Sequence, residues 1–472
     1  MQKATILSIL LPTIALSALP SAAQSSALCP ADLKPAIDRI TAAPEFERAI
    51  WGISIVPLTT DRPNPLYQHN AKQRLIPASN AKLLTTAAAL KALPTDFKVQ
   101  TQIYDLGNDR YLLHGQGDPS LTQTQFDALV RQLKQAGIQT IQELMFDSQY
   151  FGLETIPPDW AWEDIHVDYA PPVTGLIFEQ NAIAFTLTPT QVGQPLVYQW
   201  KQSADADRYP VENYTKTVEP EQPEFIKIVQ PRPGTVQLFG QLRAGAEPEE
   251  FGIADQSFDR FRDRFITTLT KVGITVKSHR SQNTAIDPPS TKPIAAVDSP
   301  PLSEWIQEIN QFSNNLYAEA LLRQLATRDH SQPPYSRELG LIALKDKLTQ
   351  LGISPESYQL VDGSGLSRRN WVSAESLVNT LQIMKDDRIF RQSLPVNGQR
   401  GSLRHRFKNL PAIVQGKTGF LTGAVSLSGY VSPPNYSPIA FSILLNHATI
   451  ENSDQIKAID TIVELLAKLK PC

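Results

Sequence analysis

Pro77-Ala78-Ser79-Asn80-Ala81-Lys82 opens a run of small and apolar residues, 83–90, that is typical of a buried helix. Ser79 and Lys82 lie three residues apart and therefore share one helix face. A lysine amine beside a serine hydroxyl can take its proton and turn the oxygen into a nucleophile. The start of a helix offers free backbone N–H groups to a developing oxyanion, and burial behind Lys82 would lower its pKa. A serine and a lysine at this spacing also arise by chance, so the pair needs support from the rest of the chain.

Two further motifs follow in the order in which they accompany such a pair in serine acyl-transfer enzymes. Ser313 and Asn315 form a Ser-x-Asn motif between the predicted helices 302–312 and 316–326, and Lys417-Thr418-Gly419 stands on a predicted strand. A second Ser-x-Asn, at Ser281 and Asn283, lies beside a proline-rich linker, so we favour the one at Ser313. The three motifs together predict a catalytic site.

The first two motifs predict which residue attacks the substrate, which residues transfer protons and which residue holds the substrate. Ser79 would attack a carbonyl, and neutral Lys82 would accept the hydroxyl proton. Ser313 would relay a proton to the leaving amine. Asn315 would hold an amide carbonyl of the substrate.

The third motif predicts how the substrate is held. Lys417 would supply positive charge near Ser313 and near a terminal carboxylate, to which Thr418 would offer its hydroxyl. The backbone N–H groups of Ser79 and Phe420 are expected to form the oxyanion hole. Gly419 is expected to let the substrate lie close to the strand edge.

The bulk composition excludes several kinds of function. The 472 residues exceed what a single core usually holds, so more than one domain is expected. The formal net charge is −3 and no basic block is present, which argues against nucleic acid as a partner. The seven histidines show no metal-ligand spacing, so neither a metal nor another cofactor is predicted.

The N-terminus predicts export. Residues 1–23 have a positive start at Lys3, a short apolar stretch and small residues before Gln24, which is the pattern of a signal peptide. No later stretch is long and apolar enough to span a bilayer. Cys29 and Cys472, the two cysteines, stand at the two ends of the mature chain. In an oxidising compartment they would form a disulfide that ties the ends together, and the alternative is two unpaired thiols.

The pattern of predicted helices and strands along the chain indicates an α/β protein in which one domain is interrupted by an insert. Residues 24–98 and 291–472 are expected to form one domain, because helical patterns there frame three antiparallel strands near 412–417, 426–431 and 439–445. Residues 99–290 are β-rich and read as an inserted α+β region, with two small domains. A proline-rich segment, 285–301, would lead the chain back.

The chain resembles low-molecular-mass penicillin-binding proteins of the D-Ala-D-Ala carboxypeptidase/endopeptidase type (peptidase family S13, class C). The resemblance rests on the three motifs and on three further stretches, 115–119 (GQGDP), 160–164 (WAWED) and 362–368 (DGSGLSR), and it covers essentially the whole mature chain. The 234 residues between Ser79 and Ser313 fit that family's large insert. β-Lactamases and simpler carboxypeptidases of the same fold have far fewer residues there.

The resemblance implies both fold and activity. The fold would be that of serine β-lactamases and transpeptidases, with an antiparallel sheet between helical layers. The enzyme would act in the periplasm on peptidoglycan stem peptides, releasing terminal D-Ala and cutting D-alanyl cross-links to diaminopimelate, and penicillin would acylate Ser79. Asp164 and Tyr169 would bind the diaminopimelyl end, and Arg368 would be a carboxylate partner. Thr422 replaces a longer polar residue of some relatives, which leaves the side-chain preference open.

Two other functions fit parts of the pattern. A β-lactamase would need a deacylating base, for which Glu375 and Asn379 have a suitable spacing inside a predicted helix. A catalytically inactive wall-binding scaffold would not need Ser79 and Lys82 to be intact. Trp160 and Trp162 fit core or interface packing better than ligand contact. Asp164 is as compatible with a surface or capping carboxylate as with a substrate contact.

Overall fold

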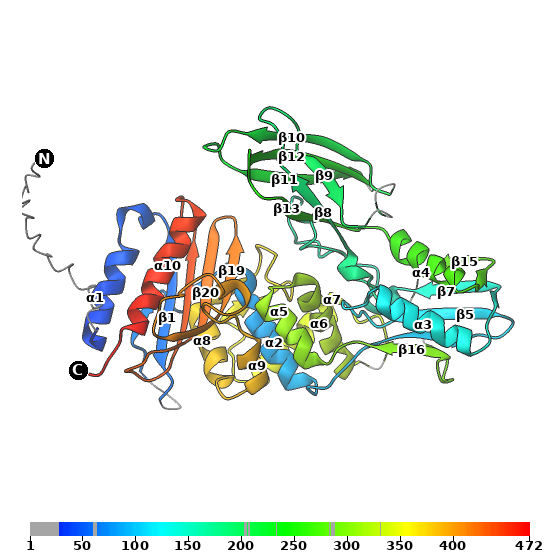
Figure 1. Ribbon diagram of the computed structural model, residues 1–472. Helices are drawn as coiled ribbons and strands as arrows, with labels where there is room; N and C mark the ends of the chain where they lie inside the picture. The colour runs from blue at the N-terminus through cyan, green and yellow to red at the C-terminus, as the bar shows by residue number, and fades with distance from the viewer. Residues whose placement is uncertain are drawn as a thin grey trace, which may run out of the picture.

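The computed structural model describes residues 28–59, 64–202, 205, 208–232, 234–282, 284, 288–330 and 332–472. The predicted signal peptide and Asn283 lie outside this part. At the left of Figure 1 lies a five-stranded antiparallel sheet with the strand order β19-β20-β21-β1-β2. Its strands are β19 (Ile413–Leu421), β20 (Ala424–Ser432), β21 (Ile439–Asn446), β1 (Ile50–Pro57) and β2 (Tyr67–His69). The first and last strands of the chain thus lie side by side, and they pair from Ile50–Asn446 to Pro57–Ile439.

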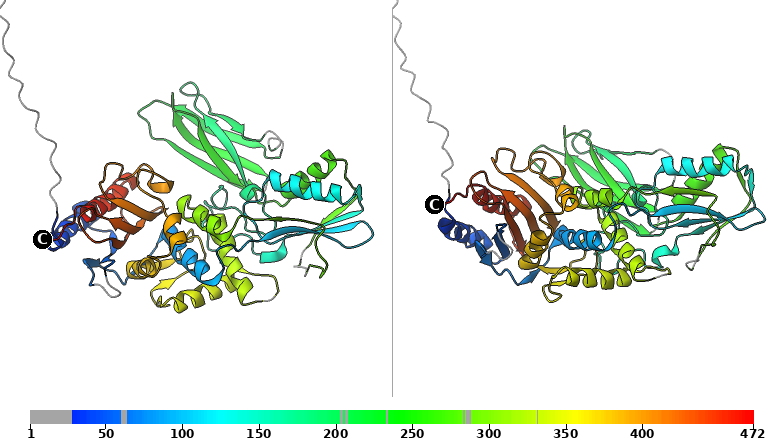
Figure 2. Two further views of the ribbon diagram at one scale, coloured as in Figure 1. Left: turned by 60° about the horizontal axis from the view of Figure 1, so that its bottom comes forward. Right: turned by 90° about the horizontal axis from the view of Figure 1, so that it is seen from below.

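One face of this sheet is covered by the two ends of the chain. Helix α1 (Pro30–Thr41) and helix α10 (Asn452–Ala467) lie on the outer side in both views of Figure 2. The closing helix buries Ile459, Ile462, Val463 and Leu466 completely, which is one stripe at helical spacing against the alternating apolar residues of the strands. Cys29 and Cys472 form a disulfide at this end, with Cα atoms 5.7 Å apart.

The other face carries the helical layer that holds the Ser79 segment. Helix α2 (Ala81–Ala92) buries nine of its twelve residues, because its alanines and threonines let the neighbouring helices approach closely on all sides. Around it lie α5 (Leu302–Gln311), α6 (Asn315–Leu325), α7 (Arg337–Gln350), α8 (Ala374–Ile383) and α9 (Arg388–Ser393). The expected antiparallel sheet between helical layers is confirmed. A small sheet of β17 (Tyr358–Gln359), β18 (Trp371–Ser373) and β3 (Arg74–Leu75) edges this layer.

The first part of the insert is a mixed sheet with two helices on one core. The strand order is β15-β7-β5-β4-β16, where the strands are β4 (Gln100–Asp105), β5 (Arg110–Gly115), β7 (Glu143–Asp147), β15 (His279–Ser281) and β16 (Ala295–Asp298). Helices α3 (Gln123–Gln135) and α4 (Asp259–Lys271) pack on it through phenylalanines such as Phe126 and Phe265. The short strands β6 (Thr140–Ile141) and β14 (Thr275–Val276) pair beside it.

The second part of the insert consists of two three-stranded sheets over a separate core. Their orders are β13-β8-β9 and β10-β12-β11, and they project at the top of Figure 1. The strands are β8 (Ala182–Thr188), β9 (Val197–Trp200), β10 (Val211–Val218), β11 (Phe225–Arg232), β12 (Thr235–Arg243) and β13 (Glu249–Ala254). Four of these strands, β9, β10, β11 and β13, were not predicted, because burial does not alternate regularly along them and their sequences lack a clear apolar–polar alternation.

The return of the chain from the insert differs from the predicted boundary. Strand β16 pairs with β4 from Ala295 to Asp298, although the boundary at 290/291 assigned these residues to the catalytic part. We therefore propose that the insert runs to Asp298. Within the described residues, no helix combines the length and the apolar character needed to cross a bilayer.

Candidate active site

Ser79 lies in a tight turn that two strands hold in place. The turn, η2 (Ala78–Asn80), leads directly into α2. The Asn446 side chain binds both the N–H and the carbonyl of Ile76, at 2.8 and 3.1 Å. Ser426 Oγ donates to the Pro77 carbonyl at 2.7 Å and accepts from the Asn80 side chain. Strands β20 and β21 thereby fix the backbone immediately before the nucleophile.

Two glycines make room for this turn. At Gly365, where φ is +81°, an added Cβ would collide with the Ala78 carbonyl oxygen. At Gly419 it would lie 2.7 Å from the Pro77 carbonyl oxygen. The absence of a side chain at Gly419 thus permits the Ser79 turn to approach the sheet. A close approach of the substrate to this strand edge stays a prediction.

Lys82 is completely buried and has three polar contacts. Its Nζ lies 3.0 Å from Ser79 Oγ, 2.6 Å from Asn315 Oδ1 and 2.6 Å from the Ser364 carbonyl oxygen. A neutral amine has two hydrogens and one lone pair. If the hydrogens go to Asn315 and Ser364, the lone pair points to the Ser79 hydroxyl, which is the orientation that a general base needs.

Burial also adjusts the charge of Lys82. Desolvation lowers its pKa to about 7, and the nearby carboxylates of Asp362 and Glu319 oppose that shift. Lys417 is equally buried, and its pKa is lowered by desolvation and then by the charge of Lys82. The two lysines therefore disfavour each other's protonation.

Ser313 and Lys417 form a second pair beside the first. Ser313 stands between α5 and α6 with φ at +59°, a strained conformation for serine that points to a functional constraint. Lys417 Nζ, on β19, lies 2.9 Å from Ser313 Oγ and donates to the Thr418 carbonyl at 2.9 Å. The Thr418 hydroxyl donates to Ser402 Oγ at 2.7 Å.

These side chains border a cavity of about 410 Å³. It is lined by Ser79, Asp164, Tyr169, Phe312, Ser313, Asn315, Gly365, Leu366, Phe420, Leu421 and Thr422. Three motif elements from distant parts of the chain thus meet at one opening. Lys82 and Lys417 lie beneath it, and Arg368 and Thr418 are not among the lining residues. Glu375 and Asn379 do not line the cavity either, so the structure does not place the deacylating base of a β-lactamase there.

The segment that crosses from the insert brings the remaining predicted residues to the site. Tyr169 Oη donates to Asp164 Oδ1 at 2.7 Å, and the Tyr169 carbonyl accepts from Asn315 Nδ2 at 2.8 Å. Burial raises the pKa of Asp164, while the Tyr169 hydrogen bond and the charge of Arg368 act in the opposite direction. Arg368 itself is exposed in the glycine-rich loop. Trp160 is buried and donates to Asp362, so it serves packing, whereas Trp162 is exposed.

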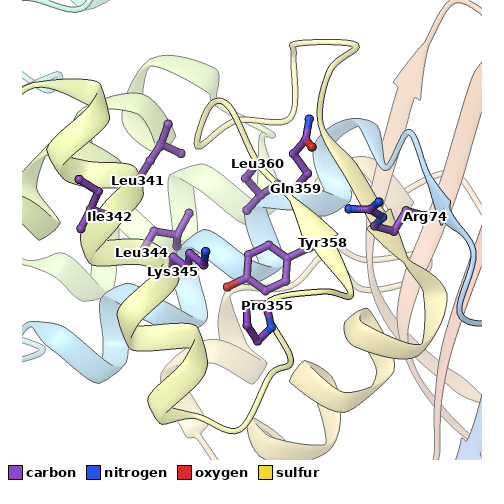
Figure 3. A pocket seen from close by; sticks show the side chains of 9 residues that line it. All are labelled: Arg74, Leu341, Ile342, Leu344, Lys345, Pro355, Tyr358, Gln359 and Leu360. Atoms are coloured by element: carbon purple, nitrogen blue, oxygen red, sulfur yellow. The ribbon is translucent and has the colours of Figure 1, made fainter.

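A second cavity, of about 420 Å³, lies between α7 and β17 (Figure 3). Its lining is mostly apolar, with Tyr358 and two cations, Arg74 and Lys345. No motif residue contributes to it, and among its described lining residues there is no serine or cysteine beside a base. The cavity at Ser79 is therefore the candidate active site.

Sequence reasoning missed three contributors to the site. The Ser364 carbonyl is a backbone group, so its place in the site cannot be predicted from side-chain patterns in the sequence. Glu319, four residues after Asn315 on a buried helix, was detectable as a carboxylate on an otherwise apolar face. Phe312 adds an exposed ring to the cavity beside Ser313.

Comparisons with known proteins agree with this geometry. The model of the D-Ala-D-Ala carboxypeptidase 3 (S13) family matches residues 33–469. A D-alanyl-D-alanine carboxypeptidase of Actinomadura sp. (strain R39) is 30% identical over 471 residues, covering 93% of this chain and 85% of its own. Penicillin-sensitive carboxypeptidase A of Dictyostelium discoideum is 29% identical over 462 residues, covering 85% and 84%.

The fold has a counterpart among solved structures. Penicillin-binding protein 4 from Haemophilus influenzae superposes with a TM-score of 0.76 at 21% identity, covering 93% of this chain and 99% of that one. The structure of the same protein complexed with a β-lactam gives a TM-score of 0.72.

Proposed function

Because the chain belongs to the D-Ala-D-Ala carboxypeptidase 3 (S13) family, we propose that it is a serine-type D-Ala-D-Ala carboxypeptidase and DD-endopeptidase of peptidoglycan stem peptides. The observation that carries the proposal is the contact of Lys82 Nζ with Ser79 Oγ at 3.0 Å, at the edge of a cavity that Ser313 and Asn315 also line. A nucleophile, its base and a proton relay are thus within reach of one bound carbonyl.

In acylation, neutral Lys82 takes the Ser79 proton as the oxygen attacks the carbonyl of the penultimate D-Ala. Negative charge develops on the carbonyl oxygen, and the backbone N–H groups of Ser79 and Phe420, which both line the cavity, are the proposed oxyanion hole. The proton reaches the leaving amine through Ser313, whose Oγ lies 2.9 Å from Lys417 Nζ. The products are released D-Ala and an ester on Ser79, which water then hydrolyses with the same groups in reverse roles.

The substrate is held from both sides of the scissile bond. An amide nitrogen has two hydrogens, so Asn315 can keep the Tyr169 carbonyl and still donate to a substrate carbonyl. The terminal carboxylate binds near Lys417 and Thr418, and Arg368 is a further carboxylate partner. A carboxylate beside Lys417 favours its charged form, and that charge favours neutral Lys82. Substrate binding thus helps to prepare the base.

The other end of the substrate reaches the insert. Asp164 and Tyr169 present a carboxylate and an aromatic face at the cavity. We propose that they receive the amino end of the diaminopimelyl side chain, because an ammonium group pairs with a partly buried carboxylate. This contact would make cross-linked peptides substrates as well.

We also propose that the protein acts in the periplasm. The predicted signal peptide and the disulfide between Cys29 and Cys472 both fit an oxidising compartment outside the cytoplasm. Residues 24–98 and 299–472 would then form the penicillin-binding domain, interrupted by the insert.

Labelling with a fluorescent penicillin tests the mechanism. The wild-type protein should form a stable adduct that maps to Ser79, and Ser79→Ala should give none, because Ser79 is the hydroxyl that lies beside the neutral base Lys82. D-Ala release from a pentapeptide tests the substrate. Labelling that survives Ser79→Ala would overturn the mechanism, and rapid turnover of penicillin without D-Ala release would indicate a β-lactamase instead.

A further inference from the structure

A buried ion pair lies directly beneath the active site. Glu319 follows Asn315 by one helical turn on α6 and is completely buried. Its Oε2 lies 3.2 Å from Nη1 of Arg323, one further turn along the same helix and also completely buried. None of the steps proposed for acylation uses either residue.

Glu319 holds the loop that contacts Lys82. Its Oε1 accepts hydrogen bonds from the backbone N–H groups of Gly363 and Ser364, both at 2.9 Å. The carbonyl of the same Ser364 accepts from Lys82 Nζ at 2.6 Å. A single side chain therefore connects the helix that supplies Asn315 with the carbonyl that orients Lys82.

A second carboxylate fixes the rest of this loop. Asp362 accepts from the backbone N–H groups of Gly365 and Ser367, each at 2.7 Å, and from the Asn370 side chain at 2.8 Å. Because Asp362 already holds the turn, the contact of Glu319 is not needed merely to close the loop. Its distinct contribution is the position and the electrostatic environment of Ser364 and Lys82.

The ion pair is poorly suited to a role in stability alone. Nε and Nη2 of Arg323 have no hydrogen-bond partner among the described residues. Burying two charges costs more than their attraction returns unless the geometry is excellent, and apolar replacements are often as stable. A charged pair with two unsatisfied nitrogens therefore calls for another explanation.

We propose that Glu319, held by Arg323, is a positioning residue for acylation that sets both the orientation and the basicity of Lys82. The inference rests on the proposed function and extends it. The groups that face Lys82 are Ser79 on its own segment, Asn315 and Glu319 on α6, Asp362 and Ser364 on the loop, and Lys417 on β19. The two carboxylates favour its charged form, and Lys417 opposes it. Burial and the charge of Asp362 raise the pKa of Glu319 itself, whereas Arg323 and the hydrogen bonds from Ser364 favour its carboxylate form.

The variant Glu319→Gln removes the negative charge of Glu319 but keeps the shape of its side chain. The amide oxygen can still accept from the two backbone N–H groups, but the negative charge next to Lys82 is gone. The second-order rate constant for acylation by a fluorescent penicillin, measured from about pH 5 to pH 9, should keep a rising acid limb whose midpoint moves to lower pH. Glu304→Gln, an exposed carboxylate on the neighbouring α5, is the matched control and should leave the midpoint unchanged.

Two further variants complete the test. Glu319→Asp keeps the charge but shortens the reach to Ser364, so the plateau rate should fall while the midpoint stays near that of the wild type. If Glu319→Gln does not fold because Arg323 is left unpaired, Glu319→Gln/Arg323→Gln removes both charges. A smaller downward shift is then expected, because loss of the Arg323 cation acts in the opposite direction.

The outcomes distinguish this inference from the proposed function. A midpoint that stays at the wild-type value in the glutamine variants, with a rate that falls equally at all pH values, would mean that Glu319 only supports the fold and would overturn the inference. Absence of labelling in the wild type would instead overturn the proposed function.

Discussion

At the scale of single residues, the chemistry depends on Lys82 being neutral while completely buried. Its Nζ has two acceptors, Asn315 Oδ1 and the Ser364 carbonyl, in addition to Ser79. A protonated lysine would donate to all three and could not take a proton from the serine. The acylation rate must therefore follow the charge of this amine.

The first prediction concerns this pH dependence. The pKa of Lys82 is lowered to about 7, so a protonated, inactive base predominates below that pH and a neutral base above it. The rate constant for acylation by penicillin should rise with pH and reach half of its plateau near pH 7. Because Lys82 and Lys417 interact, this midpoint belongs to the pair. A rate that is independent of pH from about 5 to 9 would contradict the role of Lys82.

The second prediction concerns the end of the substrate that lies toward the insert. Asp164→Asn removes the charge but keeps the hydrogen bond from Tyr169. For peptides with a free amino group at that end, kcat/KM should fall by about 10- to 100-fold, which corresponds to the loss of a charge-assisted hydrogen bond.

Penicillin lacks that amino group and supplies the control for Asp164→Asn. Acylation of Ser79 by penicillin should remain within a few-fold of the wild type. An equal loss with penicillin and with the peptide would show that Asp164 supports the cavity rather than the ligand.

The residues that sequence could identify here are those whose side chains carry the proposed chemistry. Recognisable spacings mark Ser79, Lys82, Ser313, Asn315 and Lys417. Of these, Ser79, Ser313 and Asn315 line one cavity, and the two lysines contact Ser79 and Ser313. The contributions of the Ser364 carbonyl and of Ser402 could not be predicted, because they depend on where a loop lies in space. The contact of Gly419 with the Ser79 turn could not be predicted either, because Pro77 and Ser426 come near this glycine only in the fold.

At the scale of secondary structure elements, three segments converge at the site and pack in direct contact with one another. The Ser79 turn lies between the glycine-rich loop at Gly365 and strand β19 at Gly419. Both contacts are between backbones, so neither neighbour can rotate away. The position of the nucleophile is therefore decided by packing of elements, not by its own side chain.

The third prediction follows from this packing. In Gly419→Ala the new methyl group meets the Pro77 carbonyl at 2.7 Å as well as Ser426 Oγ, so the turn or the strand must shift. A displacement of about 1 Å at the nucleophile can cost 100-fold, so acylation of Ser79 should fall by roughly that factor. Overpacking should also lower the free energy of unfolding by about 1–3 kcal/mol.

A glycine on the same hairpin provides the control for Gly419→Ala. Gly423 has φ at +73° and open space around the position of an added Cβ, so Gly423→Asn should be tolerated, because asparagine adopts this conformation readily. Equal acylation by Gly419→Ala and the wild type would show that the turn is not confined as described.

The success of prediction also differed among elements. Helices such as α5, α6 and α10 were placed within a few residues, because their apolar stripes face a core. The strands of the outer sheets of the insert were largely missed. In β13 burial changes along the strand instead of alternating, and in β11 the apolar Phe225 is exposed and Pro231 interrupts the pattern. Short strands of this kind are defined by their partners rather than by their own composition.

At the scale of the whole molecule, the two chain ends are joined on the face of the sheet opposite to Ser79. The backbone of Leu28 exchanges hydrogen bonds with Lys468 and Lys470 next to the Cys29–Cys472 disulfide. The sequence left open whether the two cysteines pair, because spacing alone cannot decide that the ends meet.

The fourth prediction concerns this closure. Cys29→Ser should lower the free energy of unfolding by about 2–5 kcal/mol, because the cross-link constrains the unfolded chain over nearly its whole length. The melting temperature should fall by several degrees, and a reductant should have the same effect on the wild type. Acylation of Ser79 at room temperature should be unchanged, since α1 and α10 lie on the other face of the sheet. Two thiols reactive without reductant in the wild type would contradict the bond.

The pairing of β1 with β21 has a consequence for the synthesis of the protein. The strand made first remains without its principal neighbour until the strand near the very end of the chain has been synthesised. Contacts between such distant segments form slowly, and an apolar strand that waits for its partner is prone to aggregation. The same late strands hold the turn that carries Ser79. A chain in which β20 and β21 have not yet been synthesised therefore lacks the contacts of Ser426 and Asn446 that hold the Ser79 turn.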